Sequence, residues 1–249
     1  MLVLLPPSET KRPGGDGGPL TASALSFPDL HPQRKELLDE LVELARDVPA
    51  SRAALGLSPR QDDEIARNAA LWTAPTLPAL QRYTGVLYDA LDAGSLRGAG
   101  AARARERLVV ASALFGLLRA TDPIPAYRLS AGSALPGRPT LAARWRPLLD
   151  PVLAALVAGE TVVDLRSGPY AALGRVPGAV TVDVSGRRPD GGRVVVSHFN
   201  KAHKGRLARA LATTRAEPSD AAAVAAVARR AGLRVERAGP THLTLVVPA

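Results

Sequence analysis

The chain has no cysteine, and this absence removes several kinds of chemistry at once. Disulfide bonds, thiolate metal sites, iron–sulfur clusters and a cysteine nucleophile are all excluded. Histidine is scarce as well, and none of its pairs has the His-x-x-x-His spacing of a helical zinc site. The four histidines are His31, His198, His203 and His242. From these residues we predict no metal site and no cofactor.

Aromatic residues make up only 4% of the 249 residues, whereas 46% of the chain is hydrophobic. A chain of this length buries a sizeable core, which must here consist mainly of alanine, leucine and valine. No stretch approaches the roughly 20 apolar residues that cross a bilayer. The apolar start, residues 1–5, stops at Pro6-Pro7 and has no basic leader, unlike a signal peptide. We expect a cytoplasmic protein with no membrane partner.

Acidic residues are outnumbered, 23 against 32 lysines and arginines, and the formal net charge is +9. This balance favours nucleic acid, an anionic membrane or a phosphorylated small molecule as partner. An arginine- and alanine-rich composition is also typical of a high-GC bacterial genome, so the charge is informative only where it is local. It is local in residues 191–216, which contain no aspartate or glutamate.

Hydrophobic periodicity predicts the secondary structure along the chain. We expect strands at residues 1–5, 161–165, 179–184, 193–199, 233–237 and 241–247, and helices at residues 35–47, 59–71, 75–92, 141–156, 204–212 and 219–230. Residues 103–118 begin as a helix, and their apolar second half fits a helix or a strand. The predicted fold is α/β (α+β): a single compact domain over residues 1–249, with a mixed sheet surrounded by helices and a helical insertion at about residues 35–100.

Residues 55–60 form a short connection between two predicted helices. A helix-hairpin-helix has such a connection and binds phosphate through backbone N–H groups. The second glycine of that motif is missing after Gly56. A helix-hairpin-helix and a plain αα-hairpin therefore both fit the sequence.

Two loops carry more polar side chains than packing requires. Residues 6–11, Pro-Pro-Ser-Glu-Thr-Lys, follow a predicted strand directly, where ligand sites are commonly presented. The second loop lies in residues 112–129, is restrained by two prolines, and contains Arg119, Asp122, Tyr127 and Arg128. Two guanidinium groups near a carboxylate and a phenol suit phosphate or carboxylate recognition. An internal Arg–Asp pair that holds the loop shut fits equally well.

The third polar segment, residues 196–206, lies in the acid-free region. Its order of strand, polar turn and basic helix directs backbone amides and ammonium groups towards one place, which outlines an anion site. A solvated basic helix face is the alternative. The basic residues of the acid-free region are Arg193, Lys201, Lys204, Arg206, Arg209 and Arg215, with His198 and His203 among them.

Taken in order, these segments resemble the YaaA family, bacterial proteins associated with the response to peroxide stress. The resemblance covers nearly the whole chain and is carried by residues 4–11, 112–129, the helix around Trp145, residues 163–170 and residues 197–205. Residues 112–129 are similar to the family's Leu-Ser-Gly-Leu-Tyr-Gly-Leu-Leu-Arg-Pro-x-Asp-x-Ile-x-Pro-Tyr-Arg-Leu. The chain departs from the family at Ala113, Ala120, Phe115 and Phe199, and the last two lack the tyrosine hydroxyl that is common there.

The resemblance implies an unusual α/β fold with a helix-hairpin-helix and a positively charged cleft that binds DNA. It also implies a link to lower free intracellular iron and to limited oxidative damage, without an assigned reaction. Carried onto this chain, the anion- or nucleic-acid-binding candidates are Ser8, Lys11, Arg119, Arg128, Lys201, Lys204 and Arg206.

Two functions remain open from the sequence. One is a peroxide-stress protein whose basic cleft binds DNA or another phosphate-bearing ligand; the other is an enzyme that acts on a nucleotide or phosphorylated small molecule. The candidate acid–base residues are Glu9, Asp122, Tyr127, Asp164, Ser167 and His198. A deep pocket favours the enzyme, and an open groove favours DNA. Either way, we expect Lys11, Arg119, Arg128 and Lys201 to surround one cleft.

Overall fold

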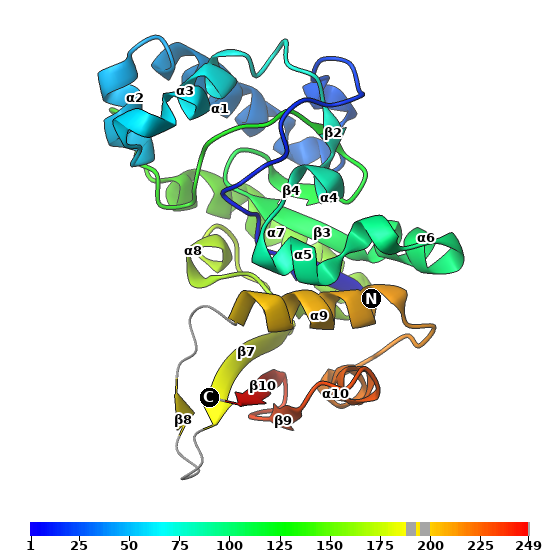
Figure 1. Cartoon of the computed structure of the whole chain (residues 1–249). Helices are drawn as coiled ribbons and strands as arrows, with labels where there is room; N and C mark the ends of the chain where they lie inside the picture. Colours follow the sequence, from blue (N-terminus) through cyan, green and yellow to red (C-terminus); the bar gives the residue numbers. More distant parts are fainter. Residues whose placement is uncertain (188–192, 195–199, 249) are drawn as a thin grey trace.

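A computed structural model describes residues 1–187, 193–194 and 200–248 (Figure 1). In that part of the chain eight strands form one mixed sheet in the order β4-β3-β1-β6-β7-β10-β9, with β8 paired to β7. These strands are β1 (Leu2–Leu5), β3 (Leu108–Ser112), β4 (Gly116–Arg119), β6 (Val162–Asp164), β7 (Val180–Arg187), β8 (Arg193–Val194), β9 (Val235–Arg237) and β10 (His242–Pro248). A separate pair joins β2 (Leu77–Pro78) to β5 (Pro123–Ile124).

The centre of the sheet is parallel, and its strands β1 and β3 are almost entirely apolar. In β1, the run Leu-Val-Leu-Leu is buried at every position, and so is Leu-Val-Val-Ala-Ser in β3. Strands of a parallel sheet covered on both faces have such continuous apolar runs instead of alternation. Val3 pairs with Leu108 on one side and with Val163 on the other, which places β1 between β3 and β6.

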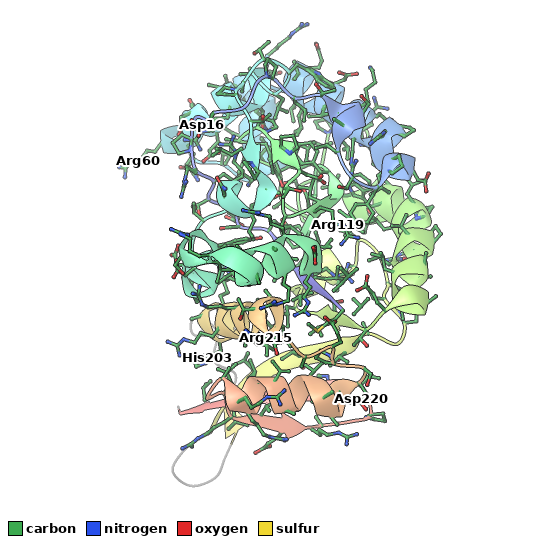
Figure 2. All side chains as sticks on the ribbon, turned by 90° about the vertical axis from the view of Figure 1, so that its right-hand side faces the viewer. Asp16, Arg60, Arg119, His203, Arg215 and Asp220 are labelled. Atoms are coloured by element: carbon green, nitrogen blue, oxygen red, sulfur yellow. The ribbon has the colours of Figure 1, made fainter. Side chains whose placement is uncertain are left out.

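Helices cover both faces of this sheet. Figures 1 and 2 show α5, α6 and α9 on one side and α7 on the other. The longer helices are α1 (His31–Leu44), α2 (Val48–Leu55), α3 (Asp62–Ala69), α6 (Gly98–Arg107), α7 (Leu141–Gly159), α9 (Asn200–Thr213) and α10 (Ala221–Arg230); α4 (Ala79–Arg82), α5 (Val86–Leu91) and α8 (Gly168–Ala171) are short. Single 3-10 turns lie at Ala22–Ala24 (η1), Pro28–Leu30 (η2), Pro59–Gln61 (η3) and Ala93–Ser95 (η4). None of the described helices is both long enough and apolar enough to cross a membrane.

The parallel strands follow one another in a doubly wound order. Numbered along the chain, β1, β3, β6, β7 and β10 lie in the spatial order 2-1-3-4-5. The chain therefore leaves β1 towards one side and reaches β6 on the other. Ligands of such sheets bind at this reversal, in the crevice outside the carboxyl ends of the strands.

The predicted fold class, an α/β protein with a mixed sheet and surrounding helices, is confirmed. The ambiguous residues 103–118 contain both structures, because α6 ends at Arg107 and β3 begins at Leu108. The remainder turns back as β4, and Gly116 permits this with a φ of +71° while a Cβ there would lie only 2.8 Å from Trp145. The buried apolar side chains form one cluster from Leu2 to Val247.

Several predicted boundaries were wrong. The helix predicted at residues 35–47 lies at His31–Leu44 as α1, and a separate helix, α2, follows at Val48–Leu55. Pro49 lies in the first turn of α2, where its missing N–H is not needed. Asp47 caps that turn by accepting from the backbone N–H of Ala50. The helix expected at residues 75–92 is divided into β2, α4 and α5. Of the strand expected at residues 193–199, only β8 lies within the described residues.

Candidate functional site

A cavity of about 850 Å³ lies at the carboxyl ends of β1 and β6. We call it the crevice. Its walls come from six parts of the chain: residues 6–10 after β1, residues 84–88 at the start of α5, residues 130–132, residues 165–170 after β6, Asp183 of β7, and Asn200, Lys201 and Lys204 of α9. In Figure 1 these elements converge where α5, α8 and α9 meet.

Two lysines of α9 supply positive charge to the crevice. Lys201 is exposed, and Lys204, three residues further along the same helix face, is half-buried. The Nζ of Lys204 donates to the carbonyl oxygen of Leu165 at 3.2 Å. Burial lowers the pKa of Lys204, against the opposing effect of Asp183 and Asp164. The crevice thus holds one solvated cation and one that burial makes more responsive to a nearby anion.

Hydroxyl and carboxyl groups complete the polar lining. Ser8 and Glu9 come from the loop after β1, and Ser167 comes from the loop after β6. The crevice therefore brings together five sequence-predicted residues: Ser8, Glu9, Ser167, Lys201 and Lys204. Thr84, Tyr88 and Asp183 line it too, although their sequence context contained no signal that distinguished them from packing residues.

Lys11 lies behind the wall of the crevice and is only 8% exposed. Its Nζ donates to the carbonyl oxygens of Ser8 and Glu9 at 3.0 and 3.2 Å, and lies 4.1 Å from the centroid of the Tyr127 ring. Burial lowers the pKa of this ammonium group to about 7; Glu64 and Glu9 oppose that shift, and Arg128 and Arg67 add to it. Lys11 thereby ties the loop after β1 to the core.

Tyr127 is a member of a buried hydroxyl cluster. Its OH lies 2.7 Å from Ser112 Oγ and 2.8 Å from Tyr83 OH, and the side chain is 1% exposed. Burial raises the pKa of Tyr127 well above its ordinary value. Phe115 packs edge-on against this ring, with 5.4 Å between centroids. In this conformation Tyr127 supports the site from the core instead of facing a ligand.

Arg128 lies next to the crevice in a fixed backbone. Asn68 accepts from its N–H and donates to its carbonyl oxygen, both at 2.8 Å. The Nη2 of Arg128 pairs with Glu9 Oε2 at 3.2 Å. A core asparagine thus positions one of the predicted anion-binding cations.

A buried ion pair at the end of β6 was not singled out from the sequence. Arg166 donates through Nε and Nη2 to both carboxylate oxygens of Asp164, at 2.9 and 2.8 Å. The same guanidinium reaches the carbonyl oxygens of Tyr170 and Gly174. Asp164, which was an acid–base candidate, is thereby committed to shaping the loop after β6. The Asp-x-Arg spacing directly after an apolar strand was the available signal.

Arg119 and Asp122 do not join the crevice, so the expectation of one cleft surrounded by all four cations was wrong. The hairpin turn at Gly116 makes β4 antiparallel to β3, and it carries Arg119 back beside Val109. Arg119 lines a different cavity, of about 490 Å³, with Met1 and Leu2 at the amino end of β1, which is the end opposite the crevice. Figure 2 shows it well apart from His203 of α9.

Asp122 holds the turn after β4. Its Oδ1 accepts from the N–H and the hydroxyl of Ser26, and its Oδ2 accepts from the N–H of Arg119. Every one of these contacts connects local backbone or neighbouring loop atoms. Asp122 therefore holds the loop through backbone and hydroxyl donors, and the guanidinium of Arg119 donates instead to the carbonyl oxygen of Glu106.

The remaining basic candidates differ in position. Arg206 is exposed on α9 and does not line the crevice. Burial, together with the charge of Arg206, lowers the pKa of neighbouring His203. His198 and Phe199 lie outside the described residues.

The connection between α2 and α3 is acidic at the position where a helix-hairpin-helix would bind phosphate. Gly56 has a φ of +64°, and Ser58 and Gln61 form a capping box. The first turn of α3 contains Asp62, Asp63 and Glu64. These carboxylates stabilise the helix dipole and would repel a phosphate. Figure 2 shows Arg60 of this connection pointing outwards. A phosphate site at residues 55–60 stays a prediction, with this charge against it.

Comparison with known proteins identifies the family. The family model described as "Peroxide stress protein YaaA" matches residues 1–238. The chain belongs to the YaaA peroxide stress protein family. Among similar proteins, a UPF0246 protein of Corynebacterium efficiens is 50% identical over 253 residues, covering 99% of this chain and 100% of the relative. A UPF0246 protein of Streptomyces coelicolor is 46% identical over 245 residues, covering 96% and 94%. The resemblance seen in the sequence motifs is confirmed.

Proposed function

We propose that this YaaA family protein acts in the peroxide stress response by binding a phosphate-bearing small molecule, of about nucleotide size, in the crevice. The observation that carries the proposal is the position of Lys201 and Lys204 beside a cavity of about 850 Å³ at the carboxyl ends of β1 and β6. That volume lies within the range of about 300–1,000 Å³ for small-molecule sites. The crevice also lies where doubly wound sheets bind ligands.

The charge distribution supports a small ligand over duplex DNA. Nonspecific duplex binding draws its affinity from cations spread along successive phosphates. Here Arg119 lies near the amino end of β1, away from the crevice, and Glu9 and Asp183 line the crevice beside the lysines. Two carboxylates among two ammonium groups suit a compact ligand that has its own hydrogen-bond donors.

The enzyme hypothesis uses the same crevice. Glu9 and Ser167 line it, whereas Tyr127 and Asp122 are buried. A reaction on a bound phosphorylated molecule would draw its acid–base groups from the first pair. We further propose a cytoplasmic location, where such molecules are abundant, and an indirect effect on iron.

Isothermal titration calorimetry with AMP, inorganic phosphate and a short DNA duplex tests the proposal. We expect AMP to bind and Lys201→Ala to weaken its affinity about tenfold, the loss typical of one charge-assisted hydrogen bond. Arg206→Ala is the matched control, because Arg206 is an exposed cation on the same helix outside the crevice. AMP affinity should be unchanged in that variant.

Duplex DNA gives a different pattern in the same titrations. Lys201→Ala and Arg206→Ala would then weaken binding alike, and log affinity would fall with log salt by about 0.9 per neutralised phosphate. That result, with no AMP or phosphate binding, would replace the small-molecule proposal by DNA binding.

A further inference from the structure

Two arginines beside the crevice meet carboxylates in different ways. Arg166 uses the edge of its guanidinium that carries Nε and Nη2, and Asp164 fills both positions at 2.9 and 2.8 Å. This side-on, bidentate arrangement is the strong mode of carboxylate and phosphate recognition by arginine. It is the reference for the second pair.

Arg128 meets Glu9 through Nη2 alone. Its Nη2 lies 3.2 Å from Glu9 Oε2. Its Nε is buried and has no hydrogen-bond partner among the described residues. Most buried donors in folded proteins have an acceptor, and a bound ion or ligand is one way to satisfy a donor that lacks one.

The two partners also differ in how firmly they are held. The side chain of Arg128 is 13% exposed, and Asn68 holds both the backbone N–H and the carbonyl group of Arg128. The side chain of Glu9 is 67% exposed and lines the crevice. An exposed carboxylate loses little on moving into water, whereas the arginine stays in place.

We propose that Glu9 is an internal substitute for a ligand, and that an oxyanionic group of the true ligand displaces it to bind Nε and Nη2 of Arg128 together. The inference rests on the proposed function and extends it. The ligand then carries two separated anionic groups: a phosphate near Lys201 and Lys204, and a second carboxylate or phosphate at Arg128. Glu9 lowers the affinity for such ligands by competing for the same cation.

Matched probes test for the second anionic group. 6-Phosphogluconate and glucitol 6-phosphate share an open six-carbon chain and differ only at C1, which is a carboxylate in the first and a hydroxymethyl group in the second. Calorimetry should show tighter binding of the first. Glu9→Gln should raise 6-phosphogluconate affinity about tenfold, and glucitol 6-phosphate affinity much less. Arg128→Lys in the Glu9→Gln background should remove the gain in affinity, because an ammonium group cannot donate the two parallel hydrogen bonds that Nε and Nη2 donate. Glu43→Gln, in an exposed pair with Arg46, is the control and should change neither affinity.

One outcome is that Glu9→Gln binds 6-phosphogluconate no more tightly than the wild type, while Lys201→Ala still weakens AMP binding. That result would overturn this inference and leave the proposed function standing. If neither the wild type nor any variant binds a phosphate-bearing probe, the proposed function itself fails. A crystal structure of Glu9→Gln grown in malonate decides the Arg128 site without either sugar. An oxyanion bound to Nε and Nη2 of Arg128 supports the inference. The absence of a bound anion at these two atoms in that crystal overturns it.

Discussion

The ammonium nitrogen of Lys11 lies 4.1 Å from the centroid of the Tyr127 ring, with the carbonyl oxygens of Ser8 and Glu9 as its hydrogen-bond acceptors. Neither carbonyl carries a full charge, and the ring face attracts a cation only modestly. The contact joins residues 116 positions apart. It connects the loop after β1 to the core beneath the crevice, and its strength depends on the proton that Lys11 carries.

Stability should therefore depend on pH through Lys11. Burial lowers its pKa from about 10.5 to about 7 in the folded chain. Between these values the unfolded chain binds a proton that the folded chain lacks, so the free energy of unfolding rises with pH. Relative to Lys11→Met, the wild type should gain roughly 1.4 kcal/mol for each pH unit above 7. Urea denaturation between pH 6 and 9 measures this difference.

The control for that experiment is Lys35→Met. Lys35 is exposed in a surface pair with Asp39, so its removal should leave the pH dependence of unfolding unchanged. Parallel curves of unfolding free energy against pH for the wild type and Lys11→Met would contradict this account. They would show that Lys11 keeps its proton in the folded chain across this range, as it does in the unfolded chain.

Close packing of α9 on α5 should make Gly205 intolerant of a side chain. A Cβ at this position would lie 2.2 Å from the carbonyl oxygen of Leu87. Gly205→Ala should destabilise the fold by about 1–3 kcal/mol through forced separation of the helices. Gly100→Ala in α6 is the control, since the nearest atom to its Cβ is 3.8 Å away, and it should stabilise by about 0.5–1 kcal/mol. Equal midpoints in chemical denaturation would contradict this account.

The Asp164–Arg166 pair should be important for stability, unlike exposed pairs. Asp164→Ala leaves the guanidinium of Arg166 buried without its carboxylate, which typically costs about 3–5 kcal/mol. Removing Glu43 from its exposed pair with Arg46 should cost less than about 1 kcal/mol. Thermal and urea unfolding of both variants measure the contrast. A small loss for Asp164→Ala would mean that the carbonyl oxygens of Tyr170 and Gly174 suffice for Arg166.

Asp122 should affect folding and not ligand binding. Asp122→Ala removes acceptors from the N–H and hydroxyl of Ser26 and from the N–H of Arg119, and should destabilise by about 1–3 kcal/mol. Because this turn lies away from the crevice, near the amino end of β1, AMP affinity per folded molecule should equal that of the wild type. Calorimetry on protein shown to be folded measures it. Lost affinity in a stable variant would return Asp122 to the list of functional candidates.

Much of the fold was accessible from the sequence because burial leaves a local pattern. The almost entirely apolar runs of β1 and β3 identify strands covered on both faces, and the periodic leucines of α1 identify a helix. The family was accessible as well, since the motif in residues 112–129 is long. Residues 103–118 stayed ambiguous because a short apolar run fits either structure until its neighbours are known.

The site could be predicted only in part. Ser8, Glu9, Ser167, Lys201 and Lys204 were each named as candidates from the sequence, and they line one crevice because loops that leave the carboxyl ends of parallel strands lie at the same end of the sheet. Arg119 was misplaced because the direction of β4 depends on a hairpin, and its sequence does not state whether the chain turns back. Lys11 was predicted as a ligand-facing cation, and its burial against Tyr127 is a tertiary contact.

The sequence by itself determined composition-level and local properties: a cysteine-free α/β chain, its apolar strands, its acid-free segment and its family. Only the tertiary structure decided which charged groups share a space. Side-chain type and spacing specify what a residue can do within a few residues of itself. Strand order and direction determine which loops meet, and these follow from the packing of the entire core. Arg128 illustrates the difference, since its charge was evident from the sequence, while its buried, half-filled fork beside Glu9 exists only in the folded chain.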